Sequence, residues 1–347
     1  MLSALRKIRT FWKGRSRRAK ARLLLPPSIA LFIVGFGFYT MSMPGKSHRG
    51  ALPPLTDEQS KLSRTLRLDV EAFADKIGER NMATTGSLDR AWSLVERSFI
   101  DADYDPKRYP YKVDNMDVAN VEATAEGKVR TDQIVVVGAH FDSAQGAPGA
   151  DDNASGVAVL LALARHFRTH RQPRSIRFVA FVNEEPPHFW TKNMGSLVYA
   201  KRCKERNEDI VAMLSLESLG YYRDEPGSQK YPPVISWFYP DRGDFVAFVG
   251  NVSSRSLVRD SIGAFRSAEQ FPSEGAAVPS FIEGVGWSDQ WSFWEVGYPG
   301  VMVTDTAPFR NPSYHTANDK PETLDYERLA RVTTGLIAVI EKLGKNP

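Results

Sequence analysis

The side chains best suited to chemistry in this sequence are two histidines and several carboxylates, each placed at the end of a short apolar run. His140 ends the run "QIVVVGAH", Glu184 and Glu185 end "SIRFVAFVNEE", and Glu217 lies at the end of "IVAMLSLES". His315 follows the run "GVMVTDT", and the acidic segment "GADDNASG" follows the first run. Taken singly, these features have ordinary explanations, such as a hydrogen-bonded histidine, a solvated turn or an acidic helix N-terminus. Together, at successive strand ends, they indicate a site.

The elements that position these residues alternate between strands and helices from Asp101 onward. The apolar runs are continuous, as in strands buried on both faces, whereas "SGVAVLLALARHFR", "GSLVYAKRCKE" and the segment from Glu322 to Leu343 have helical periodicity. A further apolar run, "DFVAFVGN", and a helix near "SDQWSFWEVG" come between them. This alternation predicts a largely parallel sheet between layers of helices. Ligand sites in such sheets lie beyond the carboxyl ends of the strands, so we expect the candidate residues to share one rim.

Carboxylates and imidazoles that converge on one spot need a counter-charge, and a divalent metal supplies it. Histidine, aspartate and glutamate are ordinary zinc ligands, and one carboxylate can bridge two ions. The charge of two Zn²⁺ ions would be balanced by three ligand carboxylates and a bridging hydroxide. The charge balance therefore favours a pair of ions, and ligands of this kind also accept Co²⁺ or Mn²⁺.

The N-terminal part of the chain differs from the rest in charge. Residues 1–22 form a basic arm, and residues 1–46 hold ten Lys and Arg but no Asp or Glu, which leaves a mildly acidic body and argues against a nucleic-acid binder. Residues 23–43 carry no charge and could span about 30 Å of hydrocarbon. We expect a single-pass transmembrane helix with a cytoplasmic N-terminus and a periplasmic or extracellular body. A cleaved signal peptide or a buried core helix is the alternative.

A linker, residues 44–60, and a domain, residues 61–347, follow the expected membrane segment. Within that domain, five segments resemble the M28 family of zinc-dependent metallopeptidases: "GAHFDS", "PGADDNASGVA", "VAFVNEE", "LSLESLGYY" and "YHTANDKPETLDYERLA". The resemblance covers roughly residues 62–343. It implies a three-layer α/β/α sandwich with a central mixed, mostly parallel sheet and a site for two zinc ions. The ligands that it implies are Asp152 as the bridge, His140 and Glu217 on one ion, and Glu185 and His315 on the other.

The resemblance also implies roles for residues beside the ligands. Glu184 matches the general base of the family, and a carboxylate near a metal-activated water can carry the proton. Asp142 matches the outer acid that orients a ligand imidazole. Tyr314 occupies the position where some relatives place a tyrosine that helps hold the tetrahedral intermediate. Two departures concern Glu217, where many members have Asp, and Gln290, which replaces the histidine of an SDH motif, so no role of that histidine passes to this chain.

An insertion after the paired glutamates, "NEEPPHFWTKNMGS", brings His188, Phe189 and Trp190 to the expected rim of the site. Phe189 and Trp190 would either form a wall of the substrate pocket that favours an apolar side chain or pack onto the body of the domain. Animal-type glutaminyl cyclases, which resemble this fold, also carry a tryptophan a few residues after paired glutamates.

The sequence therefore predicts a membrane-anchored zinc exopeptidase that acts on peptides outside the cytoplasm. The most specific prediction is an aminopeptidase that hydrolyses N-terminal residues through a metal-bridging hydroxide. A preference for the amino end over the carboxyl end rests on analogy. A glutaminyl-peptide cyclotransferase is the first alternative, and a non-catalytic membrane-tethered binding module is the second.

Overall fold

The computed structural model describes residues 35–232 and 235–345, and the chain divides into two units, Met1–Ser42 and Met43–Pro347. In the first unit the described part contains a short helix at residues 35–41. Among the described residues, no helix combines the length and the apolar character needed to cross a bilayer. The basic arm and most of the expected membrane segment, 23–43, lie outside the described residues, so the anchor stays a prediction.

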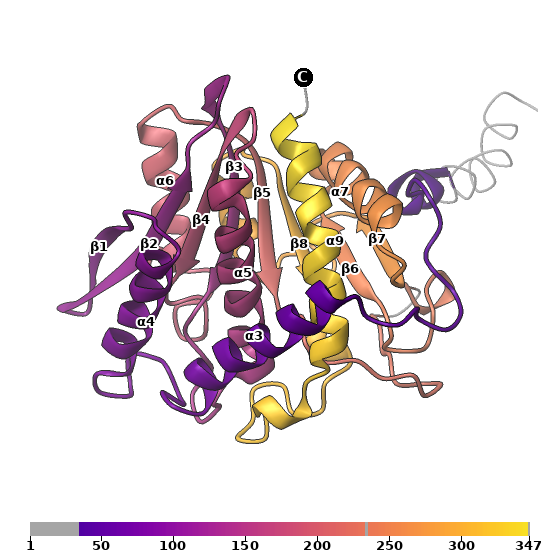
Figure 1. Cartoon of the computed structure of the whole chain (residues 1–347), viewed down its shortest axis with the longest axis horizontal. Coiled ribbons are helices and arrows are strands. Elements are labelled where there is room, and N and C mark those ends of the chain that lie inside the picture. The colour runs from indigo at the N-terminus through magenta and orange to yellow at the C-terminus, as the bar shows by residue number, and fades with distance from the viewer. Residues whose placement is uncertain (1–34, 233–234, 346–347) are drawn as a thin grey trace, which may run out of the picture. The chain divides into compact units, whose positions relative to one another are not determined.

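The second unit is built on a mixed sheet, which in the described part of the chain has eight strands in the order β1-β2-β4-β3-β5-β8-β6-β7 (Figure 1). The strands are β1 (Lys107–Val113), β2 (Met116–Ala125), β3 (Arg130–His140), β4 (Arg174–Phe181), β5 (Asp209–Glu217), β6 (Val246–Gly250), β7 (Ser273–Ala277) and β8 (Gly300–Thr304). The central strands β4, β3, β5 and β8 run parallel to one another. β2 and β6 run antiparallel to this centre, which confirms the predicted mixed sheet.

Helices cover both faces of the sheet, as expected for a three-layer sandwich. They are α3 (Asp57–Ala74), α4 (Ser87–Asp101), α5 (Gly156–Thr169), α6 (Gly195–Glu205), α7 (Arg255–Ala268), α8 (Gln290–Glu295) and α9 (Tyr326–Lys345), with an irregular turn η1 (Ala150–Ser155) before α5. The helices α3, α4, α5, α7 and α9 pack on the face turned to the viewer in Figure 1. The helices α6 and α8 pack on the opposite face.

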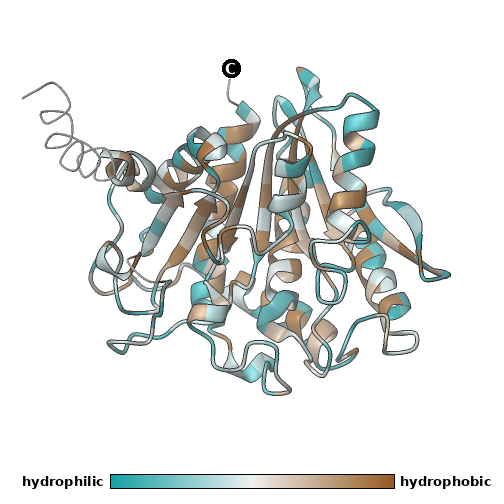
Figure 2. Ribbon diagram, turned by 180° about the vertical axis from the view of Figure 1, so that it is seen from behind, coloured by the Kyte–Doolittle hydropathy of each residue, from teal (hydrophilic) through white to brown (hydrophobic). Residues whose placement is uncertain are grey.

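The buried strand β3 shows why its run of apolar residues is continuous. Val135 and Val137 belong to the apolar cluster beneath α5, whereas Ile134 and Val136 belong to the cluster beneath α6 and α8. Successive side chains of a strand point to opposite faces, and both faces are covered here, so every position is apolar. The central strands accordingly appear hydrophobic in Figure 2. Each fully buried Val or Ile contributes about 1.5–3 kcal/mol relative to exposure.

Some elements were not predicted from the sequence. β1 and β2 form a hairpin whose turn residues, Asp114 and Asn115, have φ of 47° and 69°, the left-handed conformation of a two-residue turn. β1 is an edge strand, where proline is tolerated. Pro110 and several charged residues therefore hide its strand character in the sequence. The helix α7 and the strand β7 were also missed, and α9 begins at Tyr326 rather than Glu322.

Candidate metal centre

The candidate ligands come from loops at one rim of the sheet, as predicted. His140 ends β3, Glu217 ends β5, the pair Glu184–Glu185 lies just beyond β4, and His315 lies in the loop after β8. Because these strands are parallel neighbours, their carboxyl ends meet at one edge. Asp152 reaches the same edge from the turn η1. The rim therefore brings together all five predicted ligands.

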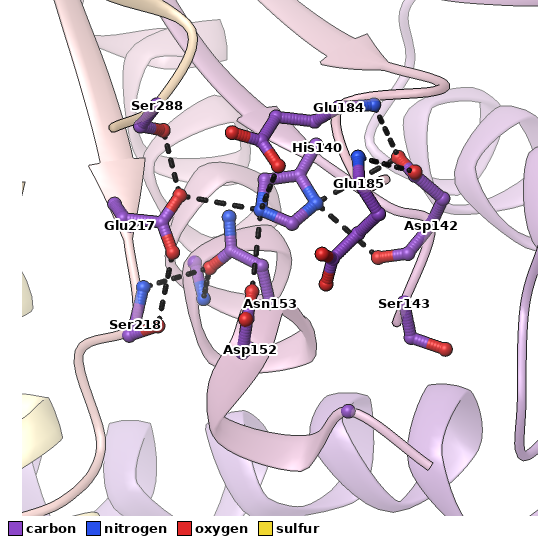
Figure 3. A network of polar contacts seen from close by, with 12 residues as sticks. His140, Asp142, Ser143, Asp152, Asn153, Glu184, Glu185, Glu217, Ser218 and Ser288 are labelled. Carbon is purple, nitrogen blue, oxygen red and sulfur yellow. Dashed lines mark hydrogen bonds and ion pairs between the residues drawn. The ribbon is translucent and has the colours of Figure 1, made fainter. Parts of the chain in front are cut away.

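Two groups of metal-competent side chains form among the described residues, and the first consists of His140, Asp152 and Glu217. His140 Nε2 lies 3.2 Å from Glu217 Oε2 and 3.3 Å from Asp152 Oδ1 (Figure 3). All three side chains are buried. Their arrangement matches the ligand set that the sequence resemblance implied for one ion.

The second group consists of Asp152, Glu185 and His315, so Asp152 is shared between the two groups. His315 Nε2 lies 3.0 Å from Asp152 Oδ2 and 3.1 Å from Glu185 Oε2. About a third of the His315 side chain is exposed, at 32%. The second group is therefore the one that opens toward solvent, where a substrate can arrive.

The ligand atoms of each group lie within 4.8 Å of one another. His315 Nε2 and Asp152 Oδ1 make no hydrogen bond to any described residue, although oppositely charged or polar atoms lie within about 3 Å of each. Around a tetrahedral zinc with bonds of about 2.0 Å, neighbouring ligand atoms lie about 3.3 Å apart. The separations of 3.0–3.3 Å in both groups fit this spacing. The residues therefore fit a pair of zinc ions.

The electrostatics of the cluster show a shortage of positive charge. Burial raises the pKa of Glu185 to about 7, and the charge of Asp152 adds to the shift. Burial also holds the pKa of Glu184 well above its ordinary value, although His140 opposes this. Burial lowers the pKa of His315, but hydrogen bonding to Asp152 and Glu185 outweighs it and raises the value to about 10. Divalent cations would supply the missing positive charge.

Glu184 lies beside the ligand groups without belonging to either of them. Its Oε2 is 3.9 Å from His140 Nε2, and the side chain is buried. The backbone N–H of Glu184 donates to Asp142 Oδ1 at 3.2 Å, and that of Glu185 donates to Asp142 Oδ2 at 3.1 Å. Asp142 therefore fixes the backbone of the two glutamates together. Its contact with His140 runs through its backbone oxygen, 3.2 Å from Nδ1, while its carboxylate is 3.7 Å away.

Sequence reasoning did not find the residues that hold the carboxylate of Glu217. Ser218 donates to Oε1 at 2.9 Å, and Ser288 donates to Oε2 at 2.6 Å. Ser288 is in turn 2.9 Å from Ser215 Oγ, with both serines buried. Serine is too common in proteins for these positions to stand out, although Ser288 opens the SDQ segment. Glu217 is longer than the expected Asp, and these hydroxyl groups fix its additional rotatable bond.

The aromatic residues predicted at the rim are placed as follows. The ring of Tyr314 stacks on His315 with centroids 3.9 Å apart, and burial keeps the pKa of its hydroxyl well above the ordinary value. Trp190 is 48% exposed, stacks on Phe189 and donates its indole N–H to Gly286 O at 3.0 Å. Gly286 lies two residues before Ser288 in the sequence. The insertion therefore packs against the segment that leads into the metal centre.

Gln290 serves a structural purpose where an SDH motif would have histidine. It is fully buried, and its Nε2 donates to Val285 O at 3.1 Å within the turn before α8. An amide in this position holds the turn through a neutral hydrogen bond.

The fold and the site together define an α/β protein with a candidate metal centre at the carboxyl rim of its sheet. The model of peptidase family M28 matches residues 120–340, and the chain belongs to this family. The uncharacterized protein YfbL of Escherichia coli (strain K12) is 40% identical over 216 residues, which cover 60% of this chain and 66% of that protein. Leucine aminopeptidase 1 of Leptosphaeria maculans is 25% identical, over 86% of this chain and 75% of that protein.

Other fungal relatives, described as probable zinc metalloproteases, are matched over 28–68% of their own length. The fold is shared with the zinc aminopeptidase BSAP from Bacillus subtilis, with a TM-score of 0.66, 16% identity, and coverage of 82% of this chain and 95% of that one. It is also shared with the glutaminyl cyclase of Fimbriiglobus ruber, with a TM-score of 0.60, 19% identity, and coverage of 87% and 99%. At these identities the likeness shows the fold alone.

Proposed function

We propose that this chain is a zinc-dependent exopeptidase, and specifically an aminopeptidase that removes N-terminal residues from peptides. The observation that carries the proposal is the pair of ligand groups that share Asp152, with the carboxylate of Glu184 beside them and in neither group. Membership of family M28 and the fold of a zinc aminopeptidase support the same function. The likeness to a leucine aminopeptidase favours the amino end of the substrate.

The residues divide the work of hydrolysis between binding and proton transfer. Zinc, when bound, polarises a carbonyl group and lowers the pKa of a bound water toward about 7. Glu184 takes the proton of the attacking water on its carboxylate and returns it to the nitrogen of the leaving amine. The buried carboxylate of Glu184 lies beside both ligand groups, where it can reach a water held between them. The carboxylate of Asp142 keeps Glu184 in place, because it accepts a hydrogen bond from the backbone N–H of Glu184.

The aromatic pair Phe189 and Trp190 forms a wall of the substrate pocket in this proposal. The support is the half-exposed indole of Trp190, which is held by Gly286 near the segment that leads to Ser288. Such a wall favours peptides with an apolar N-terminal side chain. Tyr314, stacked on His315, offers a protonated hydroxyl group near the same opening and would donate to the developing oxyanion.

The membrane anchor is a separate part of the proposal, supported by the sequence alone. In this proposal the uncharged segment at 23–43 spans the membrane, and the basic arm at 1–22 stays in the cytoplasm, so that the catalytic domain lies in the periplasm or outside the cell. Alkaline extraction of membranes and protease treatment of intact cells test this. Release of the chain by alkali would contradict the anchor. Protection of the domain from external protease, once any outer membrane is permeabilised, would contradict its orientation.

The test of the activity is mass spectrometry of a peptide mixture incubated with the zinc-loaded full chain in detergent. Stepwise loss of residues from the amino end is the expected result. Loss from the carboxyl end would assign a carboxypeptidase. Loss of ammonia from N-terminal Gln peptides, with no shortening, would assign the cyclase activity of the structural neighbour from Fimbriiglobus ruber. A folded protein that takes up no zinc would instead favour the non-catalytic binding module.

A further inference from the structure

The shared ligand Asp152 must face both ion positions at once, so its placement sets the geometry of the whole centre. Its carboxylate oxygens lie 3.3 Å from His140 Nε2 and 3.0 Å from His315 Nε2, which belong to candidate ligands themselves. Its position also depends on the backbone of the turn η1, from which the side chain projects. The hydrogen bonds made by that backbone identify what fixes it.

Three successive backbone N–H groups of η1 donate to one residue, Asp319. The N–H of Asp151 donates to Oδ1 at 2.9 Å, and the N–H of Asp152 donates to Oδ2 at 3.1 Å. The N–H of Ala150 donates to the backbone oxygen of Asp319 at 3.2 Å. Asp319 is fully buried, so water does not compete for these hydrogen bonds.

Asp319 belongs to the same loop as the ligand His315, four residues further along the chain. Its own N–H donates to Thr316 O at 3.1 Å, which closes a turn directly after His315. The carboxylate of Asp319 thus ties the backbone of the shared ligand to the loop that carries the outermost ligand. It is the only described carboxylate for which both oxygens accept from the backbone of η1.

The buried side chain of Arg80 holds the segment just before η1. The Arg80 side chain is fully buried and donates to the backbone oxygens of Gly149 and Phe141, each at 2.8 Å. Arg80 and Asp319 therefore hold neighbouring parts of the segment that leads into Asp152.

Asp142 makes a similar pair of hydrogen bonds to the backbone of Glu184 and Glu185. The carboxylate of Asp142 accepts from the N–H groups of Glu184 and Glu185, at 3.2 and 3.1 Å. Asp142 and Asp319 thus each receive two successive backbone N–H groups, and in each case the second belongs to a ligand. The sequence motifs pointed to Asp142 but not to Asp319.

We propose that Asp319 is a positioning residue that couples the two metal positions, because it holds the backbone of Asp152 in register with His315. The proposal rests on the proposed zinc-dependent function, with an ion bound by each of the two ligand groups. It predicts that loss of the Asp319 carboxylate weakens both ions together, whereas loss of an unshared ligand weakens mainly one. Asp319→Asn is the sharpest variant, since its amide offers a single acceptor oxygen and places an NH₂ group against the remaining N–H.

The test measures metal binding to the full chain by competition with a chromophoric zinc chelator, together with the absorption spectrum of the Co²⁺-loaded protein. We expect two ions in the wild type and a 10–100-fold loss of affinity for both in D319N, with an altered cobalt spectrum. The matched control is D325N, in the same region, because Asp325 accepts from the N–H of Arg328 and does not contact the centre. D325N should bind both ions as the wild type does.

Wild-type affinity for both ions and an unchanged cobalt spectrum in D319N would overturn the proposal. If the wild type took up fewer than two ions, this inference would fail, whereas the peptide assay would still decide the proposed exopeptidase activity. Should D319N not fold, amide hydrogen exchange of the metal-free wild type decides the matter. Protection of the Asp151 and Asp152 amides supports the proposal, and exchange at the rate of an open loop contradicts it.

Discussion

Replacing Glu184 with Gln separates proton transfer from metal binding. The amide has nearly the same shape as the carboxylate but cannot accept the proton of the attacking water. Glu184 belongs to neither ligand group, and its side chain comes no closer than 3.9 Å to His140 Nε2. Its backbone N–H remains free to donate to Asp142. We therefore expect E184Q to keep its zinc and lose its turnover.

The expected magnitude follows from the single function that the variant removes. A positioned general base contributes about 10²–10⁴ to the rate. Each factor of ten corresponds to 1.36 kcal/mol, so the barrier should rise by about 3–5 kcal/mol. KM should change little, because Glu184 belongs to neither ligand group and the variant removes only the transfer of the proton. The assay is steady-state hydrolysis of a chromogenic aminoacyl substrate, with zinc content measured by elemental analysis of the same samples.

The adjacent ligand provides the control. Glu185→Gln makes the same chemical change one residue further on, in a side chain whose Oε2 lies 3.1 Å from His315 Nε2. E185Q should lose affinity for one ion, and added zinc should restore part of its activity. Near wild-type turnover in E184Q would refute the assignment of the base. A loss of zinc from E184Q as large as that from E185Q would show that Glu184 is a ligand.

Three other perturbations probe the centre and its surroundings. Chelation of the metal should abolish hydrolysis and lower the Tm, and zinc should restore both, since a ligand at 1,000 times its Kd stabilises the folded state by about 4 kcal/mol; a Tm insensitive to zinc would contradict this. In the chelated protein, D289N should be more stable than the wild type above about pH 7, by up to about 4 kcal/mol, and similar near pH 4. The reason is that burial raises the pKa of Asp289 to about 7, so the folded wild type loses stability as the pH rises from the unfolded pKa through that value. If urea unfolding gave the same difference in stability between D289N and the wild type at both pH values, the effect would be excluded. W190A should raise KM severalfold for peptides with a large apolar N-terminal residue and spare those with N-terminal Ala; equal changes for both would assign Trp190 to packing alone.

The buried centre of the fold was predictable because its strands are covered on both faces. Continuous apolar runs marked β3, β4 and β5, and helical periodicity marked α5 and α6 between them. The β1–β2 hairpin was missed because an edge strand needs no such continuous run. Its partner β2 contains the buried polar residues Asn120 and Glu122, which find hydrogen bonds only in the folded structure.

The sequence by itself determined which side chains could bind metal and that they share one rim. Strand ends and ligand types are local properties, and neighbouring parallel strands bring their ends together by a general rule. Only the tertiary structure decided what holds those ligands in place. Ser288 donates to Glu217 across 71 residues of sequence, and Asp319 accepts from Asp152 across 167. Such hydrogen bonds depend on distance and direction in the folded state, and no spacing along the chain encodes them.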